Sequence, residues 1–255
     1  METFYVLLQY GLANRLRTLI GFLFIAEHQN KKVIFHWDMD DSACNGKFYD
    51  LFTKINSEHA ELHECKKIEQ KNINYLFKGQ DIISQIIKKY SSDAIPLQIQ
   101  KDHLLGCPWI CKIETQYYKR LIIKSDILNA VKNYCNKIGK FNAVHIRQTD
   151  HIQLAHENKC YTTFDEFEKF MDEFNELPMY LATDEYNVQL KYNSKSNIVI
   201  YKQILKTNSK KTRQTSLYDA FIEILICAKA NKFKGSSYSS YSKLIEIYRS
   251  MRRNT

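Results

Sequence analysis

No stretch of the 255-residue sequence approaches the roughly 20 consecutive apolar residues that a helix needs to cross a bilayer. The first residues, METFYVLLQYGLANRLRTL, carry polar and charged side chains where a secretory signal peptide has its apolar core and cleavage site. Both absences argue against a membrane span and against export. We therefore expect a globular protein of the cytoplasm.

Paired cysteines are missing as well. The sequence has seven cysteines, an odd number, and no two of them have the CxxC spacing typical of zinc and redox sites. We expect reduced thiols rather than a disulfide framework or a zinc site. Prolines and glycines are few, at three and seven, and neither an internal repeat nor a low-complexity linker is present. Any domains should therefore be closely joined.

The charge of the chain favours an anionic partner. Lysine and arginine total 37 against 28 aspartates and glutamates, a net charge of +9. Nucleic acid and a phosphorylated small molecule both fit this charge. The densest basic run, residues 202–213 (KQILKTNSKKTR), has no interleaved aromatic residues on which bases could stack, so we expect a solvated loop there and no nucleic-acid partner.

Strand-like and helix-like segments alternate along the chain, which predicts parallel sheets with crossover connections. At 255 residues and 44% apolar content, the chain can form one large domain or two compact ones. We predict an α/β fold with two Rossmann-like domains, residues 1–140 and 141–255, and a cleft between them. Residues 55–110 mix short apolar runs with polar joints and define no clear elements. The expected strands are 3–9, 31–37, 141–147, 179–183, 197–201 and 232–234, and the expected helices follow Gly11 and span 125–138, 163–174, 185–190, 216–229 and 239–249.

The strand AVHIR (143–147) places His145 and Arg147 on one face and Val144 and Ile146 on the other, because side chains alternate along a strand. One interpretation is a polar wall at the carboxyl end of the strand, where open α/β sheets bind ligands. The other is an edge strand with one solvated face. The residues of this strand alone leave both open.

Polar residues follow two further strands of the second half. Thr183 and Asp184 follow MYLA, and GSSYSS (235–240) follows KFK. In a parallel sheet these ends share one edge with Arg147, where a guanidinium fork and the N–H groups of a helix start can bind a diphosphate. Each pattern also has an ordinary explanation, because Thr-Asp often caps a helix and serine repeats often form loops.

Taken together, HIRQTD, LATD, SLYDAFIEILICAKA and FKGSSYSSYS resemble the three consecutive motifs of the fucosyltransferase-like glycosyltransferases, which have the GT-B fold. YGLANRLRTL is similar to the amino-terminal Gly-x-x-Asn-Arg-Leu element of that superfamily. Residues 55–140 are not matched. The short chain also resembles small soluble glycosyltransferases of large DNA viruses, which would place it in the host cytoplasm.

The resemblance implies a nucleotide-sugar site mostly in the second half. Arg147 would bind the donor diphosphate, His145 would lie near the base or phosphate, and Arg213 would be a second phosphate ligand. Asp184 would orient the site or touch the nucleotide. At the helix start, Ser239 and Ser240 would bind phosphate. The amino-terminal element would add Gly11, Asn14 and Arg15 to the donor site.

The chain departs from the family motifs at two positions. Where the family has a base-reading aspartate within the apolar helix, this sequence has Glu223, with Asp219 one turn earlier. Gln148 stands where some fucosyltransferases have a second arginine. The donor implied by the resemblance is GDP-fucose, with a UDP-xylose type as the alternative, and the acceptor is a glycan or glycoprotein hydroxyl.

The implied chemistry is inverting transfer without a metal ion, in which fixed positive groups stabilise the leaving diphosphate. A base for the acceptor hydroxyl is then needed from the first half, and the candidates are Asp40, Asp38 and Asp41. A solvated acidic loop is the alternative explanation of these carboxylates.

Three other functions are also compatible with the sequence. Asp38-Met39-Asp40 could instead be the Asp-x-Asp of a metal-dependent glycosyltransferase. A basic nucleic-acid-binding module would give salt-sensitive binding to many sequences. A degenerate sugar-binding scaffold would bind nucleotide without turnover. The sequence predicts neither the oligomeric state nor the linkage formed.

Overall fold

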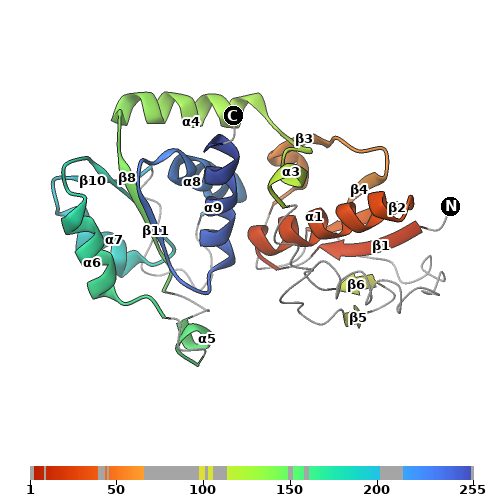
Figure 1. The fold of residues 1–255 in the computed structure, drawn as a ribbon, viewed down its shortest axis with the longest axis horizontal. Helices are drawn as coiled ribbons and strands as arrows, with labels where there is room; N and C mark the ends of the chain where they lie inside the picture. The colour runs from red at the N-terminus through yellow and green to blue at the C-terminus, as the bar shows by residue number, and fades with distance from the viewer. Residues whose placement is uncertain are drawn as a thin grey trace. The chain divides into compact units, whose positions relative to one another are not determined.

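The computed structural model of the chain separates into two compact units, Met1–Lys124 and Ser125–Thr255, each an α/β body (Figure 1). The structure describes residues 3–8, 10–39, 44, 46–65, 98–100, 103–105, 114–148, 152–157, 161–201 and 215–253.

The division falls one helix earlier than the predicted boundary at residue 140. Helix α4 (Ser125–Ile138) packs against α8 (Leu217–Lys229) of the second unit. Ile127 and Val131 form its buried stripe, and the rings of Tyr134 and Tyr180 meet edge to face at 6.0 Å. The acceptor and donor roles assigned to the two halves remain predictions.

The first unit has a five-stranded sheet in the order β4-β2-β1-β6-β5, parallel except for the β5–β6 pair. The expected strands at 3–9 and 31–37 correspond to β1 and β2. A second, antiparallel pair, β3–β7, stands apart from this sheet. The strands are β1 (Thr3–Leu8), β2 (Lys32–Asp38), β3 (Phe52–Ile55), β4 (Ala60–Cys65), β5 (Gln98–Gln100), β6 (His103–Leu105) and β7 (Leu121–Ile123).

Helix α1 (Leu12–His28) carries the core of the first unit and packs on β1 and β2 (Figure 1). Its residues from Thr18 to Ala26 are all buried, as expected of a helix that is apolar on every side. Asn30 follows the helix with a φ of 49°, a left-handed conformation that asparagine tolerates well. The short helices of this unit are η1 (Phe48–Asp50) and α3 (Glu114–Tyr118), and α3 packs against α1.

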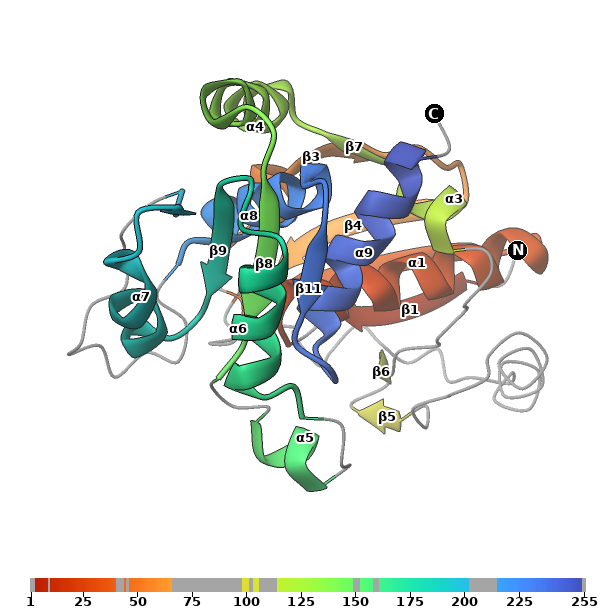
Figure 2. The same cartoon turned by 60° about the vertical axis from the view of Figure 1, so that its left-hand side comes forward.

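The second unit has a four-stranded, fully parallel sheet in the order β10-β9-β8-β11. Figure 2 shows β9, β8 and β11 side by side, with α6 in front of β8. The strands are β8 (Asn142–Ile146), β9 (Met179–Thr183), β10 (Ile198–Val199) and β11 (Phe233–Gly235), and the remaining helices are α5 (Ile152–Glu157), α6 (Phe164–Glu173), α7 (Tyr186–Asn193) and α9 (Ser240–Arg253).

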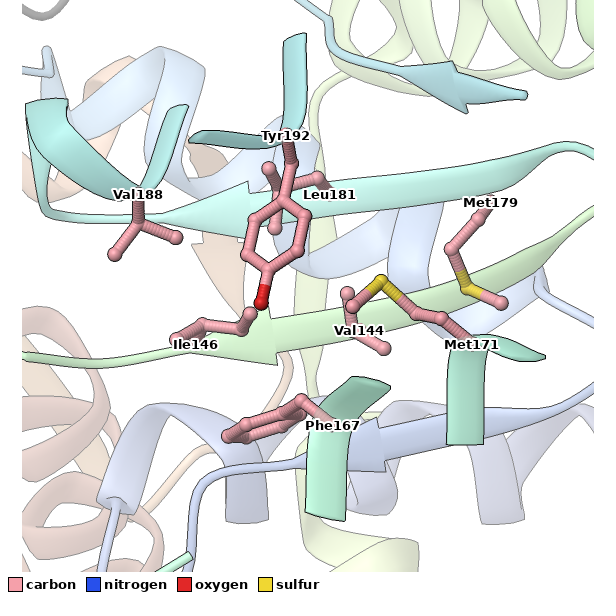
Figure 3. Packing of buried hydrophobic residues seen from close by; sticks show 8 residues of the cluster. All are labelled: Val144, Ile146, Phe167, Met171, Met179, Leu181, Val188 and Tyr192. Atoms are coloured by element: carbon pink, nitrogen blue, oxygen red, sulfur yellow. The ribbon is translucent and has the colours of Figure 1, made fainter. Parts of the chain in front are cut away.

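One face of this sheet packs against α6 and α7 (Figure 3). Val144 and Ile146 of β8 meet Phe167 of α6 and Tyr192 of α7 in a cluster whose members are all buried. Thr163 starts α6 with a reciprocal capping box, in which its hydroxyl accepts the Glu166 N–H. The predicted inward face of β8 is therefore confirmed.

The other expected elements of the second half are also present, with shifted ends. The strand at 197–201 is reduced to Ile198–Val199, and the last helix extends to Arg253. Helix α5 was not expected from the sequence. Among the described residues, no helix is both long enough and apolar enough to span a membrane.

Candidate functional site

The strand order of the second unit creates a topological switch point between β8 and β11. The chain moves outward from β8 through β9 to β10, then returns to the other side of β8 to form β11. Ligands of open α/β sheets bind at the carboxyl ends of the strands that flank such a point. Arg147 follows β8 and Ser236 follows β11, so both stand at this point.

A pocket lies at the switch point. Arg147 and Ser239, two residues predicted for the donor site, line it together with Ala155, Tyr161, Thr162, Ser236 and Ser237. The prediction that the ends of β8 and β11 come together is thus confirmed, although their role in binding remains a prediction.

Arg147 is held in place from two sides. Its side chain is 12% exposed, and its Nε lies 3.8 Å from Oδ2 of Asp184. Its backbone N–H donates to Ser236 Oγ at 2.9 Å. The other carboxylate oxygen of Asp184 accepts the Gln148 N–H at 3.1 Å. Asp184 therefore orients the segment that carries Arg147, which is one of the two roles predicted for it.

The serine-rich turn before α9 is fixed by its own hydroxyl groups. Ser236 donates its N–H and its hydroxyl to the carbonyl of His145, at 3.0 and 3.2 Å. Ser239 caps α9, because its Oγ accepts the Ser242 N–H at 3.3 Å. Ser240 is the first residue of α9, a 14-residue helix whose positive end faces this turn. These groups could hold an anion beside Arg147.

Thr162 and Ser237 join the segment before α6 to the serine turn. The Thr162 hydroxyl donates to Ser237 Oγ at 2.8 Å, and the Ser237 N–H donates to Thr162 Oγ1 at 2.8 Å. Thr162 is buried and lines the pocket. Sequence reasoning missed it, because nothing in a threonine next to a helix cap indicates a partner 75 residues away.

Neither interpretation of the AVHIR strand holds for His145: β8 lies between β9 and β11 and is not an edge strand, and His145 is buried rather than part of a ligand-facing wall. Its side chain is buried, its Nδ1 lies 2.7 Å from Ser242 Oγ, and its ring stacks on Tyr241 at 4.6 Å. Burial, together with the positive charge of Arg147, lowers the pKa of His145 to about 3. His145 is therefore neutral and supports the start of α9. The predicted contact with the donor has no support in this placement.

Glu223, predicted at a base-reading position, lies on α8, and its role toward the base remains a prediction. It is buried, and the Tyr180 hydroxyl donates to its Oε1 at 3.3 Å. Burial raises the pKa of Glu223 to about 8, so its carboxyl group is largely protonated near neutral pH. Asp219, one turn earlier, caps α8 with Ser216, whose hydroxyl donates to Asp219 Oδ2 at 2.8 Å.

In the first unit, Arg15 is a fully buried support rather than a direct ligand contact. Its Nε donates to the Tyr10 carbonyl at 2.7 Å and its Nη1 to the Asp38 carbonyl at 2.6 Å. Its guanidinium lies over Trp37 at 4.7 Å. These contacts join the turn after β1 to the end of β2. The predicted role in direct donor binding conflicts with this burial.

Gly11 and Asn14 stand at the start of α1. Gly11 is the N-cap residue, and its carbonyl accepts the Asn14 and Arg15 N–H groups at 2.9 and 3.1 Å. Asn14 is half-buried, and its Oδ1 accepts from Arg17 at 3.4 Å. Both residues follow β1, whose carboxyl end borders the corresponding switch point of this unit, between β1 and β6.

Several predicted residues lie outside the described residues. Asp40 and Asp41, both candidate bases, are among them, as is Arg213, the predicted second phosphate ligand. Asp38 is described and is half-buried at the end of β2. No role of these four residues is tested by the geometry.

Across the part of the chain that the structure describes, no group of three or more His, Cys, Asp or Glu side chains could hold a metal ion. Asp40, the second carboxylate of the Asp-x-Asp alternative, is outside that part. The described cysteines Cys44, Cys65, Cys135 and Cys227 are free thiols.

The architecture is shared with known structures. Fucosyltransferase NodZ from Bradyrhizobium aligns over 96% of this chain and 92% of its own, with 12% identity and a TM-score of 0.59. POFUT1 in complex with GDP-fucose aligns over 97% of this chain and 94% of its own, with 12% identity and a TM-score of 0.59. The chain has the fucosyltransferase-like GT-B fold.

NodZ alpha-1,6-fucosyltransferase co-crystallized with GDP is similar to this chain to the same degree, with a TM-score of 0.60. At 12% identity, these likenesses concern the fold alone. No protein-family model matches the sequence, and no curated protein matches it either. The function of the chain therefore has to be inferred from the residues at the switch point.

Proposed function

We propose that this protein is a glycosyltransferase that moves a sugar from a nucleotide-sugar donor to a hydroxyl group of a glycan or glycoprotein. One observation carries the proposal: Arg147 and the serine turn before α9 line one pocket at the β8–β11 switch point of a GT-B fold. A guanidinium beside a helix start suits a diphosphate, because both offer N–H donors and positive charge.

GDP-fucose is the first donor to consider. GDP and GDP-fucose are bound in structures of NodZ and POFUT1, which share the fold. A UDP-xylose type of donor is the alternative, because Glu223 replaces the aspartate that the resemblance led us to expect in α8. Glu223 is largely buried, and its Oε1 accepts the Tyr180 hydroxyl.

The proposed reaction is inverting and needs no metal ion. The acceptor oxygen attacks the anomeric carbon from the face opposite the diphosphate, the bond to the diphosphate oxygen breaks with its electron pair, and the acceptor proton passes to a base. Arg147 and the N–H groups of α9 stabilise the charge that grows on the diphosphate. Removing one such donor costs roughly 2.7–4 kcal/mol of barrier in oxyanion holes.

The base is proposed to come from the end of β2. Asp38 is the described candidate, and its main chain is fixed there by the Arg15 hydrogen bond to its carbonyl. Asp40 is the other candidate, two residues further along the chain. A base acts on the acceptor, so its loss should lower turnover and leave donor affinity unchanged.

Nucleotide binding and transfer test the proposal together. GDP, UDP, GDP-fucose and UDP-xylose are screened by thermal shift, since a ligand at 100 times its dissociation constant stabilises a protein by about 2.7 kcal/mol. Arg147→Ala should abolish transfer and weaken nucleotide binding while circular dichroism stays unchanged. Arg252→Ala, at the exposed far end of α9, removes the same charge outside the pocket and should change neither.

Three outcomes would each contradict the proposed mechanism. Activity that is lost to a chelator and restored by manganese, with weaker donor binding in Asp40→Asn, would support the Asp-x-Asp alternative. Salt-sensitive binding to many nucleic-acid sequences, without nucleotide binding, would support the binding-module alternative. Nucleotide binding with no transfer to any acceptor would indicate a sugar-binding scaffold.

A further inference from the structure

Two tyrosines hold a backbone conformation that tyrosine rarely adopts. Among the described residues, three that are not glycine have a positive φ: Tyr10 at 68°, Asn30 at 49° and Tyr238 at 58°. Asparagine visits this left-handed region readily, whereas a bulky side chain there is an outlier. Such outliers gather at functional sites. The positive φ of the two tyrosines therefore needs an explanation, whereas that of Asn30 does not.

Packing does not supply that reason for Tyr238. Its side chain is 54% exposed, and no described residue makes a hydrogen bond or ring contact with it. Glycine would adopt this φ without steric cost. The exposed Tyr238 ring thus gains little packing energy in the folded protein to offset the strain of its backbone.

The position of Tyr238 is at the candidate site. It stands between Ser237 and Ser239, which both line the pocket, and it directly precedes the serine that caps α9. The Tyr238 side chain does not line the pocket itself, but it is exposed between two residues that do. A ligand whose diphosphate filled the pocket would extend its remaining groups out of the pocket, past the turn that carries Tyr238.

The first unit repeats the arrangement. Tyr10 is 59% exposed, follows β1 and directly precedes Gly11, the N-cap residue of α1. It stands beside the β1–β6 switch point, as Tyr238 stands beside the β8–β11 switch point. Asn30, in contrast, lies between α1 and the amino end of β2. The strained tyrosines thus occur at the edges where α/β sheets bind ligands.

We infer that the Tyr238 ring stacks on the nucleobase of the nucleotide that the switch-point pocket binds, an inference that rests on the proposed function. Arg147 and the start of α9 account for the diphosphate and leave the base without a partner of its own. Glu223 is largely buried, and its Oε1 already accepts the Tyr180 hydroxyl. An aromatic face binds any base, because every base has a π-face. Tyr238 should therefore contribute to guanine and uracil nucleotides alike.

The test compares Tyr238→Gly with Tyr238→Phe, and uses Asn30→Gly as the matched control for a backbone change at positive φ. Calorimetry measures the affinities for GDP, UDP and pyrophosphate, and thermal unfolding measures stability. Tyr238→Gly should bind both nucleotides about tenfold more weakly, or about 1.4 kcal/mol, and pyrophosphate with unchanged affinity. Tyr238→Phe should bind all three ligands like the unaltered protein.

The melting temperature separates a ring contact from damage to the turn. Relief of strain should leave the melting temperature of Tyr238→Gly unchanged or raise it by about 2–4 °C. Unchanged nucleotide affinity, an equal loss of pyrophosphate affinity, or a loss in Tyr238→Phe as large as in Tyr238→Gly would each overturn the inference while the proposed function stands. If the unaltered protein binds neither nucleotide, the proposed function fails and the inference fails with it.

Discussion

His145 and Ser242 are 97 residues apart in the sequence, and a 2.7 Å contact joins the Nδ1 of one to the Oγ of the other. The contact ties the carboxyl end of β8 to the first turn of α9. Tyr241, next to Ser242, stacks on the same imidazole ring. The neutral, buried His145 therefore fixes the helix start that we propose as half of the diphosphate site.

Gly235→Ala should weaken this contact between β8 and the start of α9. A Cβ at Gly235 would lie 2.6 Å from Ser242 Cβ and 2.7 Å from Ser242 Oγ, so α9 must move away from β11. Overpacking of this kind costs about 1–3 kcal/mol, and urea unfolding should detect it. Nucleotide affinity should fall as well, because the start of α9 moves. Gly139→Ala is a control for lost glycine, since no atom crowds its Cβ, although its φ of 79° carries a separate strain.

His145 and Glu223 should give the unfolding free energy opposite dependences on pH. The pKa of His145 is lowered from 6.5 to about 3 in the fold, so stability is lost as pH falls from 6.5 toward 3. The pKa of Glu223 is raised from 4.5 to about 8, so stability is lost as pH rises from 4.5 toward 8. Each slope is about 1.4 kcal/mol per pH unit, and the two cancel between pH 4.5 and 6.5.

Single substitutions separate these two contributions. Urea unfolding across pH 4 to 8 measures the free energy of unfolding of each variant. Compared with the unaltered protein, His145→Asn should lose less stability in acid, and Glu223→Gln should lose less stability in alkali. Parallel pH profiles for all three proteins would contradict the burial of both groups.

Arg15→Lys should destabilise the first unit by about 2–3 kcal/mol. Lysine cannot reproduce the two hydrogen bonds to the Tyr10 and Asp38 carbonyls or the flat contact with Trp37, and both carbonyls would lose a charged donor. Arg17→Lys is the matched control, because Arg17 is half-buried and its bond to Asn14 is long, at 3.4 Å. Equal melting temperatures for the two variants would show that the buried guanidinium is dispensable.

Thr162→Val should raise the dissociation constant of the nucleotide about three- to tenfold, because the Ser237 N–H loses its acceptor and the serine turn loosens. Thr162→Ser keeps the hydroxyl and should bind normally. Thr53→Val removes an exposed threonine hydroxyl in the first unit, which donates to Ile122 at 3.3 Å, and should leave nucleotide binding unchanged. An effect of Thr162→Val on stability alone would assign Thr162 a purely structural role.

The local signals in the sequence determined most helices and strands of the second unit. Thr163 and Ser216 cap their helices where the sequence predicts, and MYLAT forms β9 with the expected bounds. Alternation along AVHIR also predicted correctly that Val144 and Ile146 face a core. These features depend on neighbouring residues, so the sequence by itself was sufficient.

The tertiary structure alone decided which polar residues face the pocket. Arg147, Ser239 and Thr162 meet there because β11 returns beside β8, a pairing that no local pattern encodes. His145, Glu223 and Arg15 have the polarity of site residues, yet each is buried by helices or strands distant in the sequence. The sequence alone does not distinguish a polar side chain that binds a ligand from one that supports the backbone. The residues that surround the side chain in the fold decide which role it has.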